Sequence, residues 1–141
     1  DAPSSITRLV NIGTEPFLVG AAVRAVLAQR LVRKLCVHCK ANERPTEELS
    51  EFLGMQGMDA DGVFVAKGCE RCRNIGYSGR LGIFELLPIS DDLAQRIVGR
   101  CDEVEIQKYM AEKKIPRLWD DAMDKLIAGG TSVSEVISVP R

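Results

Sequence analysis

The chain of 141 residues is long enough for one domain of ordinary size, or for one lobe with a small appendage. Its 45% hydrophobic and 28% charged residues are ordinary for a soluble globular protein. No apolar run approaches the roughly 20 residues of a membrane-spanning helix, and no charged-then-apolar leader opens the chain. We therefore expect a cytoplasmic protein without a transmembrane segment.

Charge alternates strongly along the chain, although the formal net charge is only −1. Residues 1–40 carry six basic and two acidic side chains, residues 41–62 one basic and six acidic, and residues 63–80 four basic and one acidic. A basic patch made from the first and third blocks could meet phosphates, anionic lipid headgroups or an acidic neighbouring subunit. A solvated face of mixed charge explains the pattern equally well, so charge alone assigns no partner.

Two helices are predicted in the first 35 residues. Ser4 or Ser5 could cap a short helix that Gly13 ends. A long amphipathic helix is predicted from about Pro16 to Leu35, because apolar residues recur there at steps of three and four. The apolar residues of this stripe are Val19, Val23, Val26, Leu27, Leu31 and Leu35. On this prediction the helix leads directly into the first cysteine and holds it rigidly.

The middle of the chain offers little for a hydrophobic core. A short helix is predicted at Glu47–Leu53, a loop at residues 54–62 and a short strand at Val63–Ala66. A small segment with so few apolar side chains usually needs a further source of stability, such as a bound metal ion.

The last part of the chain predicts one strand and several short helices. After a glycine-bounded turn at residues 76–80, the segment 81–89 is the best strand candidate in the chain. The predicted helices are Leu93–Val98 after a start at Ser90, a helix through Lys114 opened by a capping box of Asp102 and Glu105, Leu118–Ala128, and a last turn capped by Ser132 and Glu135. We therefore expect a mainly α chain with a few short strands, an α+β fragment.

Four cysteines form the most specific motif in the sequence. Cys36 and Cys39 make one CxxC pair, Cys69 and Cys72 make another, and 29 residues separate the pairs. Two residues between cysteines let a tight turn aim both sulfurs at one point, and paired CxxC motifs are typical of a tetrahedral Zn²⁺ site. Because four thiolates leave no open position for water, we expect a structural zinc. Disulfides or unrelated thiols are the alternatives, and His38 could replace one cysteine as a ligand.

Other groupings in the sequence indicate no catalytic site. His38 is the only histidine, so no Ser–His–Asp or Cys–His arrangement can be argued away from the cysteines. Cys101 is interpreted as a partly buried small residue, and the acidic cluster in residues 120–124 as a solvated face. Neither G-x-x-x-x-G-K-[ST] nor G-x-G-x-x-G occurs in the chain. Arg80 could bind phosphate or carboxylate from its glycine-bounded turn, with a surface salt bridge as the simpler interpretation.

Several stretches taken together resemble one family closely. They are residues 1–9 (DAPSSITRL), 15–18 (EPFL), 27–33 (LAQRLVR), 35–36 (LC), 68–72 with two cysteines, and 76–86 (GYSGRLGIFEL). In this order, and over essentially the whole chain, they resemble the secretion ATPases of type II secretion and type IV pilus assembly. The resemblance implies the C-terminal helical part of a RecA-like P-loop ATPase domain with a small Cys₄ zinc-binding subdomain. It divides the chain into residues 1–35 of the ATPase core, 36–75 of the zinc-binding subdomain and 76–141 with the return strand and C-terminal helices.

The same resemblance implies a function and partners. Members of this family are cytoplasmic hexamers that hydrolyse ATP to drive pseudopilus or pilus assembly at the inner membrane. The implied partners are neighbouring subunits of a homohexamer and inner-membrane platform proteins, without nucleic acid, at the inner face of that membrane. Arg8, Arg30 and Arg80 are the candidate phosphate or subunit-interface contacts, and the zinc unit is a structural or docking element.

One departure from the family is large. The Walker A loop, acidic box, Walker B and histidine box of the family precede the Asp1-Ala2-Pro3 stretch, and none occurs in this chain. Since those motifs hold the phosphates and Mg²⁺ and activate water, we expect ATP and Mg²⁺ only in a full-length parent. The chain alone is expected not to hydrolyse ATP.

A free-standing zinc-ribbon module that binds nucleic acid is the alternative function. It is suggested by Lys67, Arg71, Arg73 and Arg80, which lie near the second cysteine pair. The net charge of −1 and the small number of aromatic residues, with none in either CxxC pair, argue against it.

Overall fold

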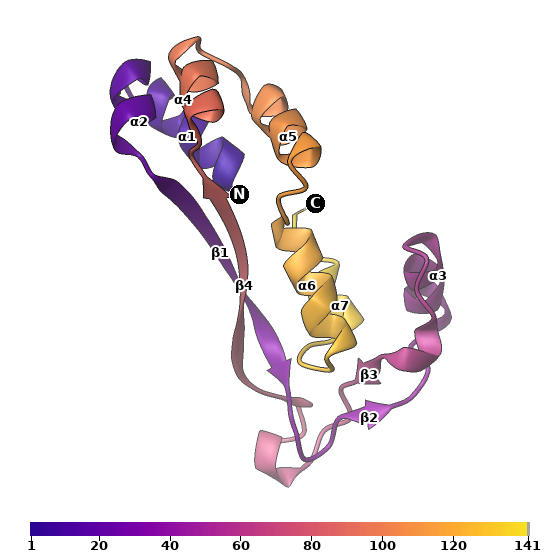
Figure 1. Cartoon of the computed structure of the whole chain (residues 1–141). Coiled ribbons are helices and arrows are strands. Elements are labelled where there is room, and N and C mark those ends of the chain that lie inside the picture. Colours follow the sequence, from indigo (N-terminus) through magenta and orange to yellow (C-terminus); the bar gives the residue numbers. More distant parts are fainter. Residues whose placement is uncertain (141) are drawn as a thin grey trace. The chain divides into compact units, whose positions relative to one another are not determined.

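The computed structural model of the chain describes residues 1–140. Its elements, labelled in Figure 1, are α1 Ala2–Asn11, α2 Pro16–Ala22, β1 Ala25–Leu35, β2 Ala41–Asn42, α3 Glu47–Met55, η1 Ala60–Gly62, β3 Phe64–Val65, η2 Glu70–Cys72, β4 Tyr77–Pro88, α4 Asp91–Val98, α5 Glu103–Glu112, α6 Leu118–Ile127 and α7 Val133–Val136. The expected mixture of helices with a few strands is confirmed. Within the described residues, no helix combines the length and apolar character needed to cross a membrane.

The chain divides into two compact units, each built from two separate segments. Unit 1 contains residues 1–29 and 84–118, and unit 2 contains residues 30–83 and 119–141. The boundary therefore falls within both β1 and β4, which pair in a two-stranded sheet. All four cysteines of the CxxC pairs belong to unit 2.

The predicted long helix from Pro16 to Leu35 is wrong. Only its first turns are helical, because α2 ends at Ala22 and residues 25–35 form the strand β1. The arrows of β1 and β4 point in opposite directions in Figure 1. Leu27 and Leu31, which a buried helical stripe would cover, are 61% and 55% exposed. Long-range pairing with β4 therefore overrides the helical periodicity of this segment, in which only Val26 and Val32 are β-branched.

The predicted strand at 81–89 is present but begins earlier. β4 starts at Tyr77 and includes Arg80, in place of the predicted glycine-bounded turn. Gly79 has a φ of 80°, so a left-handed residue is accommodated within this strand. Farther along β4 every second side chain is buried, namely Ile83, Glu85 and Leu87. This alternation places one face of β4 against the interior.

One apolar cluster holds unit 1 together. The helices α1, α2, α4 and α5 lie towards the unit 1 ends of β1 and β4 (Figure 1). The buried members of the cluster are Ala2, Ile6, Val19, Leu87, Leu93, Ile97, Ile106, Tyr109 and Met110. Burial of one face of each helix is what stabilises short helices of this kind, since few of them would be stable in isolation.

Two helix starts in unit 1 carry capping boxes, and one of them was predicted. Asp102 and Glu105 form the expected pair at α5, with Glu105 N donating to Asp102 Oδ1 at 2.8 Å and Asp102 N donating to Glu105 Oε2 at 2.9 Å. The short helix α1 is also present, but Asp1 caps it, not Ser4 or Ser5. Ser4 is instead the third residue of this helix, and its N–H donates to Asp1 Oδ1 at 2.9 Å.

A buried carboxylate joins three parts of unit 1. Glu85 on β4 is 1% exposed. Its Oε1 accepts a hydrogen bond from Ala2 N at 2.6 Å, and its Oε2 accepts one from Leu118 N at 3.1 Å. The Nε atom of Arg117 lies 3.8 Å from the same Oε2. Ala2 and Leu118 are the first residues of α1 and α6, so one carboxylate satisfies the free N–H groups of two helix starts.

In unit 2, the helix α7 is linked to β1 by a charged pair. The main-chain N–H of Arg33 donates to Glu135 Oε2 at 2.7 Å, and its Nε donates to Oε1 at 2.9 Å. Glu135 therefore does not form the predicted capping pair with Ser132. The Ser132 hydroxyl is hydrogen-bonded to Tyr77 OH at 2.7 Å and makes no cap contact. The strands β2 and β3 pair antiparallel in the same unit.

Candidate metal centre

Two tight turns bring the four predicted cysteines together. The first turn follows β1, and in it Cys39 N and Lys40 N both donate to Cys36 O, at 3.2 and 2.9 Å. The second is η2, in which Cys72 N donates to Cys69 O at 3.1 Å. The four sulfur atoms all lie within 4.8 Å of one another. These cysteines could therefore hold one metal ion between them.

The spacing of the sulfur atoms fits a tetrahedral ion and does not fit disulfides. The Sγ atoms of Cys36 and Cys69 are 4.0 Å apart, those of Cys39 and Cys72 3.7 Å, and those of Cys69 and Cys72 3.8 Å. A tetrahedral thiolate site with metal–sulfur bonds of about 2.3 Å has sulfur–sulfur edges of roughly 3.8 Å. A disulfide requires about 2.05 Å, and all four cysteines are free.

Backbone N–H groups around one sulfur favour its ionised form. Cys69 N and Gly76 N donate to Cys72 Sγ at 3.2 and 3.3 Å. Burial opposes ionisation of Cys72, but these N–H groups, together with hydrogen bonds from the Cys39 and Cys69 thiols, outweigh it and lower the pKa of this thiol to about 6. Burial raises the pKa of Cys39 to about 12. Since the thiolate is the metal ligand, N–H donors of this kind are the outer contacts that orient and stabilise a ligand.

Two glycines allow the second turn to form. Gly68 has a φ of 104°, and a Cβ there would lie 2.6 Å from Asn74 O. Gly76 has a φ of 76°, and a Cβ there would lie 2.6 Å from the Cβ of Ala66. Any larger residue at position 68 or 76 would therefore collide with a neighbouring segment of the same chain. Sequence reasoning did not find this requirement, although a glycine directly before Cys69 was a visible signal.

His38 does not join the sulfur cluster. It is exposed, and its ring nitrogens Nδ1 and Nε2 lie 3.2 and 3.1 Å from Arg71 Nη1. Among the described residues, the group with ligand atoms within reach of one ion consists of the four cysteines. The alternative in which His38 replaces a cysteine therefore has no support in this geometry.

Comparison with known proteins identifies the family. Residues 1–138 match the family described as type II/IV secretion system protein. The chain belongs to this family. It is 39% identical over 140 residues to the type IV pilus assembly ATPase PilB of Thermus thermophilus, and 39% identical over 140 residues to the type II secretion system protein E of Aeromonas hydrophila. It is 36% identical over 140 residues to the type II secretion system ATPase E of Vibrio cholerae.

These relatives are much longer than the chain. The matches cover 98% of this chain and 16% of the Thermus protein, and 99% of this chain and 28% of the Aeromonas protein. The chain therefore spans between about a sixth and just over a quarter of the length of these curated relatives. The family resemblance drawn from the sequence is confirmed, and none of these names points to nucleic-acid binding.

The three arginines suggested by the family resemblance are exposed and lie on different elements. Arg8 is on α1 in unit 1, whereas Arg30 on β1 and Arg80 on β4 belong to unit 2. Among residues 1–140, none of their guanidinium groups forms an ion pair within the chain. Their assignment to phosphate or subunit contacts in a secretion ATPase stays a prediction.

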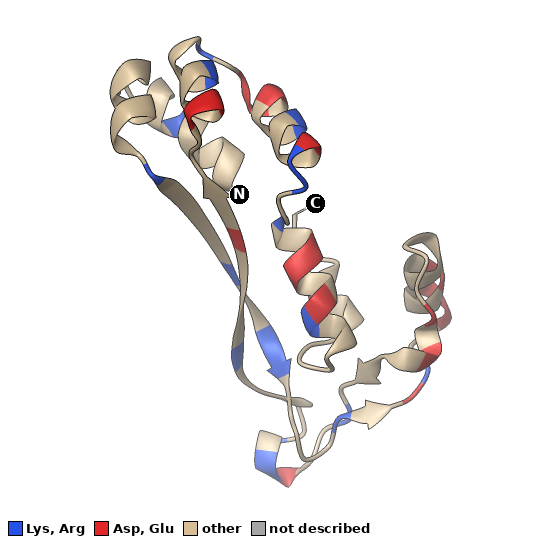
Figure 2. Cartoon of the chain, in the orientation of Figure 1, with Lys and Arg blue, Asp and Glu red and all other residues tan. Residues whose placement is uncertain are grey.

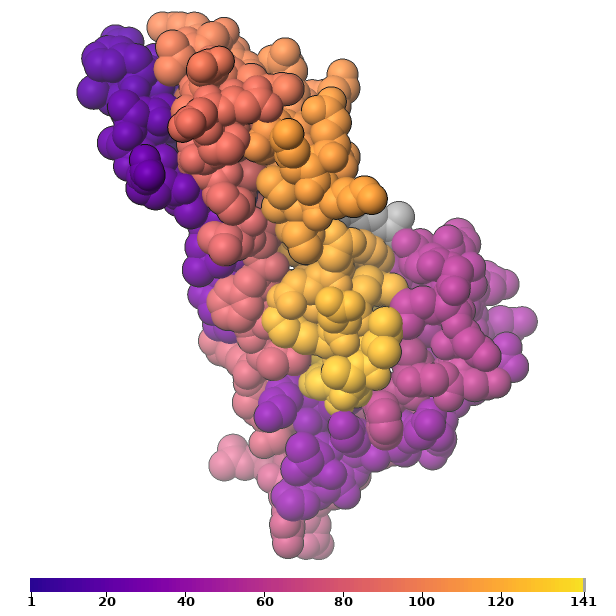
Figure 3. Space-filling view, viewed as in Figure 1, coloured from indigo at the N-terminus to yellow at the C-terminus, as the bar shows by residue number. Residues whose placement is uncertain are grey.

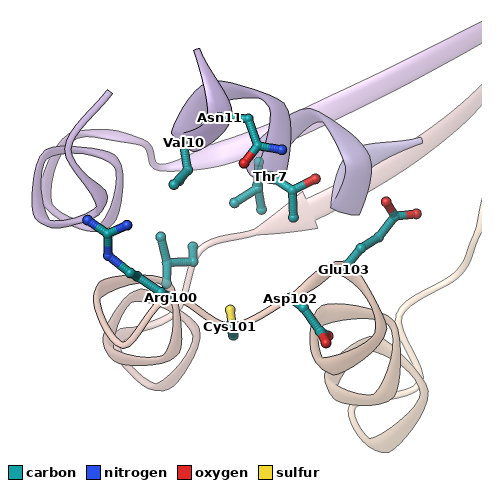
Figure 4. A pocket seen from close by; sticks show the side chains of 9 residues that line it. Thr7, Val10, Asn11, Arg100, Cys101, Asp102 and Glu103 are labelled. Carbon is teal, nitrogen blue, oxygen red and sulfur yellow. The ribbon is translucent and has the colours of Figure 1, made fainter. Parts of the chain in front are cut away.

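The fifth cysteine of this family member lies apart from the sulfur cluster, at a cavity of about 430 Å³ in unit 1. Cys101 is half-buried there, and Figure 4 shows it between Arg100 and Asp102, with Thr7, Val10 and Asn11 of α1 opposite. Burial, together with nearby acidic side chains, raises the pKa of the Cys101 thiol. The predicted half-buried position is confirmed, and the raised pKa disfavours the reactive thiolate.

Proposed function

We propose that the chain is the C-terminal part of the ATPase domain, a RecA-like P-loop domain, of a secretion or pilus-assembly ATPase. The observation that carries this proposal is the family match over residues 1–138, together with relatives named PilB and type II secretion protein E. The parent protein would be a cytoplasmic homohexamer at the inner face of the inner membrane. There it would act with membrane platform proteins to assemble a pseudopilus or pilus.

The exposed face of the strands in unit 1 supports a place within a larger domain. Leu27 on β1 is 61% exposed and Leu86 on β4 is 53% exposed. The neighbouring residues Val26, Ala28 and Leu87 pack into the apolar cluster, so Leu27 and Leu86 point to the opposite face. A two-stranded sheet with an uncovered apolar face is marginal in water, and further parts of an ATPase domain would cover it.

ATP and Mg²⁺ would bind to the parent protein and not to this chain alone. The support is the sequence itself, which contains no G-x-x-x-x-G-K-[ST] phosphate loop. The test is to measure ATP hydrolysis by the 141-residue chain and by the parent side by side. We expect turnover only in the parent, and a comparable rate from the chain alone would contradict the proposal. In the parent, Arg8→Ala, Arg30→Ala and Arg80→Ala test the proposed phosphate or subunit contacts.

The four cysteines would bind one structural Zn²⁺, which would close a subdomain of residues 36–75 between residues 1–35 and 76–141. The sulfur spacing and the N–H groups on Cys72 support this assignment, because both suit a tetrahedral thiolate site. When bound, the zinc ion would cross-link the two turns and would take no part in catalysis. Elemental analysis of the purified chain should give one zinc per chain, and a value well below this would contradict the assignment.

A further inference from the structure

One thiol of the sulfur cluster opens to the solvent. Cys36 and Cys72 are buried, at 1% and 4% exposure, whereas Cys39 and Cys69 are half-buried. An open hollow of about 430 Å³ leads to Cys69. The residues that line this hollow are His38, Cys69, Glu70 and Arg71. Figure 3 shows the pink segment that contains η2 projecting from the surface of unit 2. A small molecule can therefore reach Cys69, although a structural zinc site needs no such access.

Cys72 holds the thiol that is best placed to react with Cys69. Their Sγ atoms are 3.8 Å apart, whereas those of Cys36 and Cys69 are 4.0 Å apart. Cys69 directly precedes η2 and Cys72 ends it, so a bond between them lies within one turn and needs no movement of one turn against the other. Pairs of cysteines separated by two residues are the ones that form reversible disulfides in oxidoreductases.

A cationic side chain also lines the hollow. Nη1 of Arg71 lies 3.2 and 3.1 Å from Nδ1 and Nε2 of His38, and this contact holds the guanidinium on the same face as Cys69. Glu70 is the acidic residue of the hollow, and Figure 2 shows red and blue segments at this end of unit 2. A guanidinium beside a thiolate can donate hydrogen bonds to a bound peroxide and stabilise the negative charge that develops on its leaving oxygen.

We propose that Cys69 is a peroxide-sensitive site, whose oxidation links it to Cys72 and releases the proposed zinc ion. The Cys69 thiolate attacks one oxygen of hydrogen peroxide, the O–O bond breaks, hydroxide leaves, and Cys69 becomes a sulfenic acid. The Cys72 thiolate then attacks the Cys69 sulfur, the S–O bond breaks, and a second hydroxide leaves. Two thiolates, one peroxide and two protons from water thus give one disulfide and two water molecules. The two sulfurs are oxidised and the peroxide is reduced.

The new disulfide leaves Cys36 and Cys39 as the thiolate ligands of the cluster. Two thiolates do not complete a tetrahedral shell, so the zinc ion is released and residues 36–76 lose their cross-link. A dithiol reductant restores both thiols, and reversible disulfides of this kind are typical of redox sensing in a reducing compartment such as the proposed cytoplasm. The release of zinc rests on the proposed zinc site, whereas formation of the Cys69–Cys72 disulfide does not require the ion.

Treatment of the purified, zinc-loaded chain with hydrogen peroxide tests this proposal. A coloured zinc indicator follows the release of zinc, and mass spectrometry of peptides prepared without reduction identifies the disulfide. We expect zinc release to rise in proportion to the Cys69–Cys72 disulfide, and dithiothreitol with added zinc should reverse both. A first disulfide between other cysteines, or formation of this disulfide without loss of zinc, would overturn the proposal.

Matched variants separate the thiol in the hollow from the other ligands. Cys69→His removes this thiol but keeps a complete ligand set, because structural zinc sites also form from three cysteines and one histidine. Peroxide should release its zinc about tenfold more slowly or slower still, since the accessible thiolate is gone. Cys36→His makes the same exchange at a buried sulfur and should release zinc like the unaltered chain. Arg71→Ala should slow release about fivefold, whereas Arg73→Ala, at an exposed position outside the hollow, should not.

The zinc-free chain tests the cysteine pair even where a histidine variant binds no metal. After treatment of the unaltered chain with a chelator, peroxide should still form the Cys69–Cys72 disulfide before any other. Equal release rates in Cys69→His and Cys36→His, or no such disulfide with or without zinc, would overturn the proposal. Zinc content before peroxide reports on the proposed zinc site, and ATP hydrolysis by the parent reports on the ATPase assignment. Failure of the redox proposal is therefore distinguishable from failure of either.

Discussion

The apolar cluster of unit 1 and the cysteine-containing segment of unit 2, residues 36–76, differ in how much hydrocarbon they bury. Unit 1 buries side chains from four helices and β4 in one cluster. In residues 36–76 the buried hydrophobic side chains are Cys36, Leu53, Ala60, Val63 and Cys72. Two of these are cysteines of the sulfur cluster. Burial of hydrocarbon therefore accounts for unit 1, whereas we expect the cysteine-containing segment to depend on the proposed zinc ion.

The largest expected effect is that of removing one sulfur ligand, which should destabilise the cysteine-containing segment and not unit 1. We expect Cys72→Ser to leave well under one zinc ion per chain, because structural zinc supplies on the order of 10 to 16 kcal/mol of apparent binding energy through its full ligand set. Amide hydrogen exchange should accelerate first in residues 36–76, while the helices of unit 1 keep their protection. Treating the unaltered chain with a chelator should give the same exchange pattern.

Cys101→Ser is the matched control for this experiment, because it removes a thiol that lies outside the sulfur cluster. It should leave zinc content and exchange in residues 36–76 unchanged. Equal loss of protection in both units after Cys72→Ser would show that the two regions do not differ as described.

Shortening a side chain of the apolar cluster should destabilise unit 1 and leave zinc binding unchanged. Leu93 is 0% exposed, so Leu93→Ala should destabilise the chain by about 2 to 5 kcal/mol through lost burial and a residual cavity. Urea unfolding followed by circular dichroism measures this cost, and zinc content should not change. Val104→Ala, at a position 54% exposed, should cost less than about 0.5 kcal/mol. Zinc loss in the Leu93 variant would refute the separation of the two regions.

The same comparison explains which features the sequence could predict. The sulfur cluster was predictable because the CxxC spacing is a local geometric requirement that leaves few alternatives. The capping box of Asp102 and Glu105 was predictable for the same reason. The segment 25–35 was not, since its three- and four-residue apolar steps suit a helix and only pairing with the distant β4 makes it a strand. Likewise, no local pattern indicates that Glu85 accepts hydrogen bonds from Ala2 and Leu118, which are distant from it in sequence.

Glu85 is a buried charged residue within the apolar unit 1, so its replacement tests how much hydrogen bonding adds to the stability of that unit. Glu85→Gln keeps the side-chain size but replaces one accepting oxygen by an NH₂ group. One of the N–H groups of Ala2 and Leu118 would then face a donor, at a cost of about 1 to 3 kcal/mol. We expect urea unfolding to show this loss with unchanged zinc content. Glu103→Gln, at the α5 start, is the control and should change stability by less than about 0.5 kcal/mol.

The smallest expected effect concerns the pair that ties α7 to β1 in unit 2. Burial opposes ionisation of Glu135, but the side chain and main-chain N–H of Arg33 outweigh it and lower the pKa of this carboxyl below its ordinary value of 4.5. A lowered folded-state pKa means that the stabilisation is present above the unfolded pKa and is lost as pH falls through the folded one.

Glu135→Gln should therefore reduce stability at neutral pH by less than about 1 kcal/mol, because Arg33 is largely solvent-exposed. The difference from the unaltered chain should shrink as the pH of urea unfolding is lowered through the acidic range. Glu51→Gln, at an exposed position of the same unit, should show no such convergence. A stability difference that stays constant with pH would mean that Glu135 acts through packing and not through its charge. Unit 2 outside the cysteine-containing segment would then resemble unit 1 in its source of stability.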